Sequence, residues 1–451
     1  MLTYSSAADA VRERRRLTSA QIIILGFSGV ILLGALLLTL PLSSRSGDFT
    51  PFGDALFTAT SAVCVTGLVV HDTATYWSGF GQGVILFLIQ IGGMGVITVA
   101  ASFAILSGKK ISLMQPSTMQ GALSAPSVGG IVRLTGFVVK TTLLLELLGA
   151  AAMAPVFCRD FGVRGLWMAL FHSVSAFCNA GFDLMGVREQ FSSLTAYAAQ
   201  PVVNVTVMLL IITGGIGFLT WDDLRTNRWH WHKYRMQTKV ILTSTGLLLV
   251  APAIYFFFRE FAALPLNERI WKSLFQAVTP RTAGFNTADL TALSEPGGYI
   301  TMALMLVGGS PGSTAGGMKT TTLAVLLSTG ISVFRHKEHT HFYGRRIDQD
   351  TIRNAVTILT LYMTLFLGGG FVMSRVEGLP LLDCLFETSS AVATVGLTLG
   401  ITPGLGSVSR WILIALMYIG RVGGLTLIFA ALSGRRQGNT ARLPQEKLMV
   451  G

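Results

Sequence analysis

Long apolar stretches recur along the whole chain and are separated by short polar segments. Several have about the 20 residues that a helix needs to cross a bilayer. Examples are Ile22–Leu40, Val84–Leu106, Val240–Phe258 and Trp411–Leu432. The first stretch runs on to Pro41 without the small-residue cleavage site of a signal peptide, so we expect a retained span. The pattern predicts an all-α integral membrane protein whose surface contacts the lipid bilayer.

Four segments share one motif, in which a Leu-Phe pair precedes small and hydroxyl residues and then a glycine followed by Leu or Phe. The segments are Ala55–Leu68, Ala169–Phe182, Ser273–Phe285 and Cys384–Leu397. The glycines recur about every 110 residues, and such a period indicates duplicated structural units. A single glycine would fit helix-on-helix packing in a membrane. Four copies in near-register, the third one residue shorter, favour a repeated functional loop.

Each repeat has one apolar span before the motif and one after it. The eight predicted spans cover about 20–42, 80–106, 132–157, 198–220, 238–258, 298–330, 352–374 and 408–432. The motif opens with a stretch such as Phe52–Val63 or Leu381–Val392, which is too short to span and suits a re-entrant half-helix. We expect four fused span–pore helix–span repeats, with eight transmembrane helices and four re-entrant pore loops in a pseudo-fourfold arrangement.

The period also sets the expected boundaries. They give a cytoplasmic N-terminal arm at 1–17, pore repeats at 18–107, 108–222, 223–333 and 334–433, and a cytoplasmic tail at 434–451. The net charge is +12. The positions of the basic residues indicate how the chain is oriented in the membrane, because Lys and Arg gather in the cytoplasmic loops of membrane proteins. We place the basic clusters in the cytoplasm with both termini, and we expect no nucleic-acid partner. The clusters are Arg12–Arg16, Lys109–Lys110, Arg225–Lys239, Arg335–Arg353 and Arg435–Lys447.

The residues that end each motif match the needs of a potassium filter. A potassium ion must lose its water, and a filter replaces that water with backbone carbonyls from four copies of a TVGYG-like loop. Glycine admits positive φ and can therefore turn a carbonyl toward the pore axis. The predicted potassium-binding residues are Val65, Thr66 and Gly67; Asn179, Ala180 and Gly181; Thr282, Ala283 and Gly284; and Thr394, Val395 and Gly396.

A glycine-rich segment interrupts the second span of the third repeat and cannot sit in a stable helix. It contains Gly308, Gly309, Ser310, Pro311, Gly312, Ser313, Thr314, Ala315, Gly316 and Gly317. Broken spans commonly line the path of a transporter, so we expect 308–319 to cross the pore as a gate; a structural kink is the alternative. The spacing also suggests a phosphate-binding loop, but Met318 intrudes before Lys319 and no strand precedes it. We expect no nucleotide on this chain.

Arg421 lies inside an otherwise apolar final span, where a charge usually faces a partner or a cavity. We expect Arg421 to hydrogen-bond carbonyls of the 308–317 loop or to present a positive barrier to cations. The alternative is an ion pair elsewhere, for example with Glu146. We also expect Arg281 to brace the third pore loop and Lys319 to reach the cytoplasmic interface by snorkelling.

These segments together resemble the membrane subunit of the Trk/Ktr/HKT superfamily of potassium transporters, and within it the bacterial Ktr subunit. The resemblance covers about 18–451 and includes Gln276–Asn286, Gly308–Thr322 and Ile419–Gly423 beside the filter loops. It implies a multi-pass protein of the bacterial cell membrane that transports potassium, with sodium as a candidate activator. It also implies a homodimer on a cytosolic ring of nucleotide-binding (ATP/ADP) regulatory subunits.

The sequence therefore predicts potassium-selective uptake through a channel-like pore with a carbonyl filter, an intramembrane gating loop and regulation by a cytosolic subunit. The alternative is an ion-coupled secondary transporter that moves potassium with sodium or protons. That alternative needs ionisable groups near mid-membrane, where Glu146, Lys319 and Arg421 are the candidates and do not repeat. No Ser/His/Asp set, HExxH sequence or paired-carboxylate motif is evident, so we expect neither an enzyme nor a transition-metal site.

Overall fold

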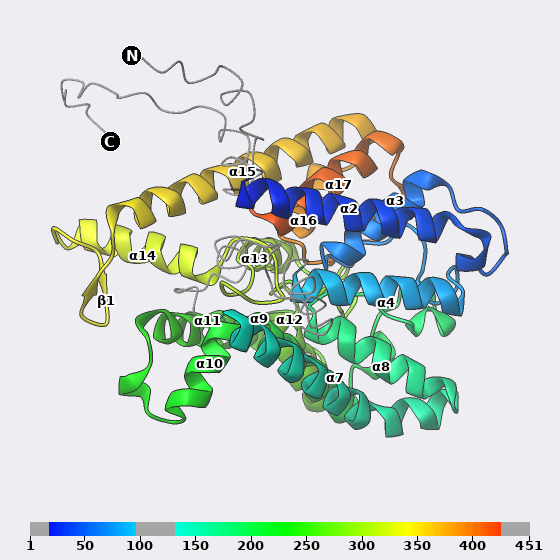
Figure 1. The fold of residues 1–451 in the computed structure, drawn as a ribbon, viewed down its shortest axis with the longest axis horizontal. Coiled ribbons are helices and arrows are strands. Elements are labelled where there is room, and N and C mark those ends of the chain that lie inside the picture. Colours follow the sequence, from blue (N-terminus) through cyan, green and yellow to red (C-terminus); the bar gives the residue numbers. More distant parts are fainter. Residues whose placement is uncertain (1–17, 96–130, 425–451) are drawn as a thin grey trace, which may run out of the picture.

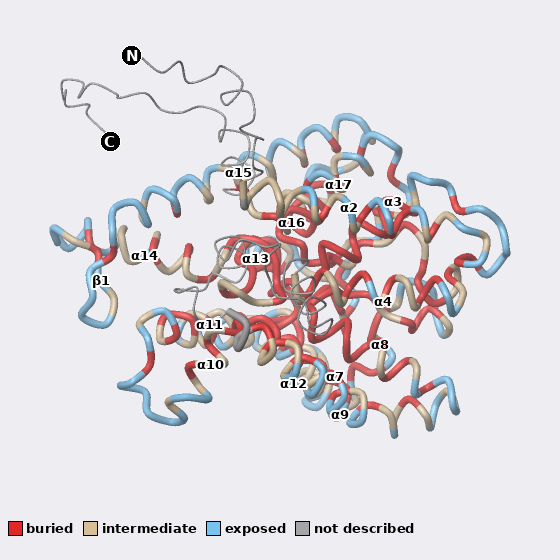
Figure 2. The backbone as a smooth tube through the Cα atoms, in the orientation of Figure 1, coloured by how far each residue is buried: buried red, intermediate tan, exposed pale blue. Residues whose placement is uncertain are grey.

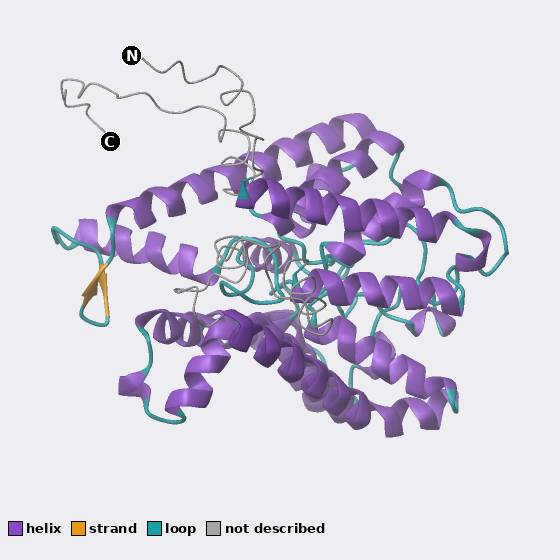
Figure 3. Cartoon of the chain, viewed as in Figure 1, coloured by secondary structure: helices purple, strands orange, loops and turns teal. Residues whose placement is uncertain are grey.

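The computed structural model describes residues 18–95 and 131–424, and helices dominate them (Figure 3). Strands within these residues form one hairpin, in which β1 (His341–Phe342) pairs antiparallel with β2 (Arg345–Arg346). The expected all-α class is confirmed. The predicted N-terminal arm, the tail and the ends of the predicted spans 80–106 and 408–432 lie outside the described residues.

Around each copy of the motif the structure has three helices in succession, which we name by position: a first helix, a short pore helix that begins the motif, and a second helix (Figure 1). The first helices are α2 (Ser19–Thr39), α7 (Ile131–Phe161), α11 (Met236–Tyr255) with the π-helical turn η6 (Phe256–Glu260), and α15 (Gln349–Glu377). The pore helices are α3 (Phe52–Val63), α8 (Arg164–Phe177), α12 (Leu266–Val278) and α16 (Leu381–Val392). The second helices are α4 (Gly79–Met94), α9 (Pro201–Gly215), α13 (Glu295–Leu306) and α17 (Ser407–Val422).

Two further helices and five short turns complete the described chain. The helices are α10 (Phe218–Asn227) and α14 (Thr320–Phe334). The turns are η1 (Pro41–Ser43), η3 (Met185–Val187), η4 (Thr195–Tyr197), η5 (Trp231–Lys233) and η7 (Thr402–Gly404). In Figure 1, α10 and the β1–β2 hairpin lie at the left end of the molecule, opposite the loop between α2 and α3.

The first helices are the ones built to face lipid. Four described helices are long and apolar enough to cross a bilayer, and each is the first helix of a repeat: Ala20–Thr39, Thr135–Phe161, Met236–Glu260 and Gln349–Glu377. Large apolar side chains on them are exposed, such as Leu33, Leu147, Leu247 and Phe371. Helices α9 and α10 would form a fifth span together, but they are bent by 95°.

The repeats contact one another in cyclic order. The second helix of each repeat lies against the pore helix of the next: α4 against α8, α9 against α12, α13 against α16, and α17 against α3. The last contact joins the fourth repeat to the first and closes the arrangement. The pore helices and the loops after them form the buried centre (Figure 2).

Three of the pore helices begin with the same local signals. Prolines at 51, 265 and 380 precede α3, α12 and α16, and the third residue of each helix is an acid: Asp54, Glu268 and Asp383. A negative charge in the first turn is favourable because it meets the positive end of the helix dipole. The boundaries predicted for Phe52–Val63 and Leu381–Val392 agree with the structure.

Candidate functional site

The four predicted filter loops adopt one unusual backbone conformation. The residue two positions before each glycine has positive φ: 49° at Val65, 56° at Asn179, 66° at Thr282 and 53° at Thr394. The glycines themselves have φ between 71° and 95°. Positive φ is strained for β-branched residues, and such strain concentrates at functional sites. The same strained pattern in all four loops indicates a shared role.

The four glycines close a ring. A methyl group added to any of them would meet the backbone of the next loop, in the order first, second, third, fourth and first again. The added carbon would lie 2.6 Å from the carbonyl oxygen of Ala180 at Gly67, 3.0 Å from that of Ala283 at Gly181, 2.5 Å from that of Val395 at Gly284, and against that of Thr66 at Gly396. The ring therefore leaves no room for a side chain at these positions.

Amide groups of the loops are bonded to the pore helices behind them. The amide of Gly67 donates to Ser61 Oγ (3.0 Å), and that of Gly396 donates to Ser390 Oγ (2.9 Å). The amides of Thr66 and Val395 donate to the carbonyls of the same serines, at 2.8 Å each. These bonds turn N–H groups away from the centre, where they would repel a cation.

The carbonyl oxygens of the filter residues are free of such bonds. None of them accepts a hydrogen bond from another residue in the described part of the chain. Thr66, Asn179, Thr282 and Thr394 are nevertheless fully buried. Buried backbone acceptors are nearly always paired. A ring of unpaired carbonyls has the chemistry to replace the water around a dehydrated cation.

The glycine-rich segment after α13 forms an ordered loop rather than a simple kink. Val307 pairs with Met318 as a β-bridge, and the amide of Gly308 donates to the Met318 carbonyl at 2.8 Å. The loop is fastened to the end of α9, because the amide of Ser310 donates to the carbonyl of Gly215 (2.9 Å) and that of Thr314 to Gly214 (3.2 Å).

The same loop lies directly against two filter loops. Thr314 Oγ1 donates to the carbonyl of Phe177 (3.0 Å) and hydrogen-bonds Asn179 Oδ1 (3.1 Å). On the other side, Gly316 contacts the side chain of Thr394, and a methyl group on Gly317 would lie 2.9 Å from the Ala393 carbonyl. The loop therefore touches the start of the second and fourth filters.

Two basic side chains, those of Arg421 and Lys319, donate hydrogen bonds to the carbonyls of this loop. The Arg421 guanidinium donates to the carbonyl of Thr314, and its other nitrogen donates to those of Gly92 and Gly93 at the end of α4. Lys319 Nζ donates to the carbonyls of Ala315 (2.9 Å) and Gly316 (3.3 Å). The snorkelling expected for Lys319 is therefore not what the structure shows.

Comparison with known proteins identifies the family. Residues 4–442 match the family model TrkH, described as "Cation transport protein". The chain belongs to the TrkH family. The Potassium/sodium uptake protein NtpJ of Enterococcus hirae is 40% identical to this chain, and the match covers 98% of this chain and 99% of the relative. The Ktr system potassium uptake protein B of Bacillus subtilis is 37% identical over the same shares.

A solved structure supports the fold of this TrkH-family chain. The crystal structure of the potassium transporter TrkH from Vibrio parahaemolyticus aligns with a TM-score of 0.72, over 92% of this chain and 86% of that one. The sequence identity of this match is 18%. It therefore bears on the helical membrane fold and not on individual site residues.

In the TrkH-family chain, three of the second helices end inside the spans predicted from hydrophobicity. Helices α4 and α17 end at the C-caps Gly95 and Gly423, and α9 ends at Gly215, two residues before Gly217; all three residues 95, 217 and 423 are glycines with positive φ. We expected 198–220 to be one continuous span, and the 95° bend between α9 and α10 corrects that expectation. The signal was available, since a Gly-x-x-Gly spacing occurs at 92–95, 214–217 and 420–423.

The first glycine of each such segment explains the close packing of the pore helix. Methyl groups on Gly92, Gly214 and Gly420 would collide with the carbonyls that end the pore helices of their own repeats, at Val63, Phe177 and Val392. Arg421 thus occupies the place that a second glycine holds in repeats one and two. The Gly-x-x-Gly spacing aligns Gly93, Gly215 and Arg421 in the sequence, and the structure adds the contacts that the arginine makes.

Two other predicted residues have different surroundings from those expected. Among the described residues Glu146 forms no ion pair with Arg421; its carboxylate accepts a hydrogen bond from Gln90 Nε2 at 3.2 Å. The Arg281 side chain is buried and forms no hydrogen bond with the described part of the chain, whereas its carbonyl accepts one from Asn179 Nδ2 at 3.1 Å. Contact with the neighbouring filter therefore runs through the Arg281 backbone.

Proposed function

We propose that this chain mediates potassium-selective uptake across the cell membrane through a channel-like pore. The observation that carries the proposal is the closed ring of four filter glycines with unpaired carbonyls. Such carbonyls compensate a potassium ion for its lost water. The names of the relatives agree with this cargo, and one of them names sodium uptake beside potassium. Sodium as an activator is part of this proposal.

The segment 308–319 acts as the gate in this proposal. It contacts the second and fourth filter loops, so an ion leaving the filter meets it next. Hydrogen bonds from Arg421 and Lys319 hold it there, and charge-assisted hydrogen bonds contribute about 1.5–3 kcal/mol each. Opening requires the loop to exchange some of these bonds for others, which makes its position responsive to a modest input of energy.

In this proposal, the energy that opens the gate comes from a ring of nucleotide-binding subunits on the cytosolic side of a homodimer. The end of the molecule with α10 and the β1–β2 hairpin carries exposed basic residues (Figure 1). They include Arg228, Lys233, Arg335, Lys337 and Arg345. Basic residues mark the cytoplasmic side, and they offer complementary charge to an acidic partner surface. The eight-span, pseudo-fourfold topology belongs to this proposal.

Growth complementation tests the filter. We would express the chain, with a regulatory partner, in a bacterium that lacks potassium uptake. Wild type should restore growth at low potassium, and Gly396→Ser should lose rescue or admit sodium, because its side chain collides with the Thr66 carbonyl. Gly404→Ser is the matched control, since a methyl group there meets nothing within 4 Å. Undiminished, potassium-selective rescue by Gly396→Ser would contradict the filter assignment.

A further inference from the structure

The four second helices differ at one equivalent position, the fourth residue after the N-cap. These residues are Gln82, Asn204, Gly298 and Arg410. Gln82 accepts a hydrogen bond from the indole of Trp167 on the next pore helix (3.0 Å). Asn204 donates to the carbonyl of Tyr197 in the preceding loop at 2.8 Å. The third repeat has no side chain at this position.

Arg410 shows what this position does where the fourth repeat meets the first. Its guanidinium donates to Asp54 at 2.7 Å and to the Pro403 carbonyl at 3.1 Å. Asp54 is the third residue of pore helix α3, and it also contacts His71 at 2.9 Å. The arginine thus bridges two repeats and neutralises the acid at the start of the pore helix.

The contact between the third and fourth repeats lacks this bridge. Asp383 is the third residue of pore helix α16 and so corresponds to Asp54. The residue that corresponds to Arg410 is Gly298, and a methyl group there would meet nothing within 4 Å. Asp383 forms no hydrogen bond or ion pair with another described residue, whereas its third-repeat counterpart Glu268 is paired with Lys272 at 3.1 Å.

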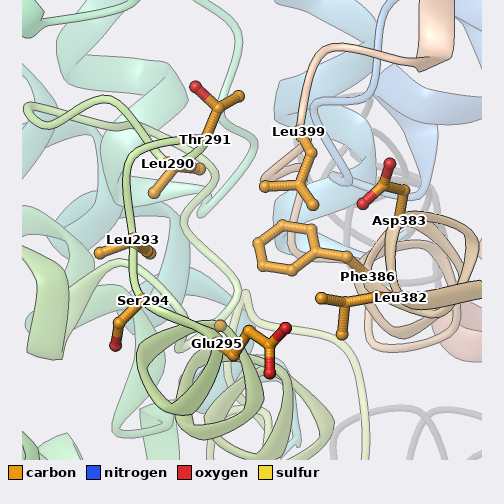
Figure 4. A pocket seen from close by; sticks show the side chains of 10 residues that line it. Leu290, Thr291, Leu293, Ser294, Glu295, Leu382, Asp383, Phe386 and Leu399 are labelled. Carbon is orange, nitrogen blue, oxygen red and sulfur yellow. The ribbon is translucent and has the colours of Figure 1, made fainter. Parts of the chain in front are cut away.

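A cavity of about 310 Å³ is lined by both Gly298 and Asp383, the residues that correspond to Arg410 and Asp54. Figure 4 shows its two walls facing each other, one from the third repeat and one from the fourth. Its apolar lining is Leu290, Leu293, Leu382, Phe386 and Leu399. Asp383 and the exposed Glu295 also line it, and the Glu295 side chain likewise has no hydrogen bond or ion pair within the described ranges.

We propose that this cavity is a binding site for a small amphipathic guanidinium, which takes the place that Arg410 fills in the neighbouring contact. A guanidinium matches the planar geometry of a carboxylate, and the leucine and phenylalanine side chains accept an apolar body. A cavity of this volume is in the range of small-molecule sites. With the orientation proposed above, it opens on the outer side of the membrane, next to pore helix α16.

The lining favours an organic cation over a bare metal ion. Potassium needs several oxygen ligands at once, whereas five of the ten residues that line this cavity carry hydrocarbon side chains, which a bare ion cannot use. An alkyl or aryl guanidinium satisfies both halves of the cavity, since its charge meets Asp383 and its body covers the apolar walls. Bound there, it bridges the third and fourth repeats as Arg410 bridges the fourth and first.

Calorimetry with benzylguanidinium tests the site on full-length protein in lipid nanodiscs, with empty nanodiscs subtracted. We expect saturable binding by wild type and at least tenfold weaker binding by Asp383→Asn. Gly298→Arg should abolish binding, because its own guanidinium fills the cavity and pairs with Asp383. The matched controls are Gly79→Arg, at an exposed helix-start glycine with open space around it, and Glu189→Gln, at an exposed acid elsewhere; both should bind as wild type does.

Absence of saturable binding by wild type would overturn the proposal, as would equal binding of neutral benzylurea. Binding that Gly298→Arg and Asp383→Asn leave unchanged would place the ligand elsewhere and overturn it too. Size-exclusion profiles of each variant establish that the protein is folded. The measurement needs no transport, so its outcome does not depend on whether the proposed potassium pathway is correct.

Discussion

Arg421 of the last described helix donates a hydrogen bond to the carbonyl of Thr314, 107 positions earlier in the chain. Its other nitrogen reaches Gly92 in the first repeat. One side chain thereby joins the first and fourth repeats to the loop of the third. Because the loop has few apolar side chains of its own, bonds of this kind decide where it rests.

Replacing Arg421 with glutamine should raise basal rubidium flux into liposomes by about tenfold. The variant loses a charge-assisted bond, and 1.4 kcal/mol corresponds to a factor of ten in an equilibrium. Arg375→Gln, at an exposed arginine of α15, should leave flux unchanged. Flux that falls or stays level in Arg421→Gln would indicate that the bond does not hold a closed gate.

The Thr314 hydroxyl should cooperate with Arg421 in holding the loop. Thr314→Val keeps the side-chain shape but removes the hydrogen bonds to Phe177 and Asn179. We expect flux to rise severalfold, and the double variant with Arg421→Gln to depart from additivity, as residues of one network do. Ser313→Ala is the control within the same loop, because the Ser313 hydroxyl has no partner among the described residues. If the effects of the two substitutions on flux simply add, the Thr314 hydroxyl and Arg421 act independently and the prediction is wrong.

Two equivalent serines should differ in their effect on selectivity. Ser61 Oγ accepts the amide of Gly67, whereas Ser175 Oγ is buried with no partner in the described chain. Ser61→Ala should lower the potassium-to-sodium permeability ratio severalfold, because the freed amide no longer points away from the pore. Ser175→Ala should change it by less than about twofold, since no bond is lost. Equal effects of the two changes would refute the proposed orientation of the loop.

Neutralising Glu146 distinguishes a pore from a proton-coupled transporter. Its carboxylate contacts Gln90 and Cys178 rather than a filter carbonyl. Glu146→Gln should therefore keep rubidium flux within about a factor of two, and a pH gradient across the liposome should not drive uptake in either protein. Uptake driven by the gradient in wild type and lost in the variant would favour the coupled alternative.

Much of the architecture follows from local patterns in the sequence. Pore helices α3 and α16 begin and end where their composition predicts, because a proline, an acidic first turn and a terminal small-residue loop are all local signals. The long apolar first helices also follow from a local signal, the length of their apolar stretches. The period of the motif further predicted four similar loops, and the loops share one backbone conformation.

The second helices show where such reasoning ends. Glycines are tolerated within a membrane helix, so we expected one span over 198–220, although the Gly-x-x-Gly spacing at 214–217 marks the place where α9 stops. The chain turns there because the amide of Phe218 finds the carbonyl of Gly312, which lies far away in the sequence. Lys319 was likewise placed at the interface, although the carbonyls of Ala315 and Gly316 satisfy its charge closer by.

The sequence by itself thus determined the helical membrane class of the protein and located four similar loops, because hydrophobic period and glycine position act over short distances. The role of these loops as a filter remains a proposal. The tertiary structure decided which groups meet. The pairing of Arg421 with Thr314 and the closure of the glycine ring join residues from different repeats, and Asp383 is left without a partner beside a cavity between two repeats. These contacts depend on how four similar units pack, and small differences between equivalent positions then set what each unit does.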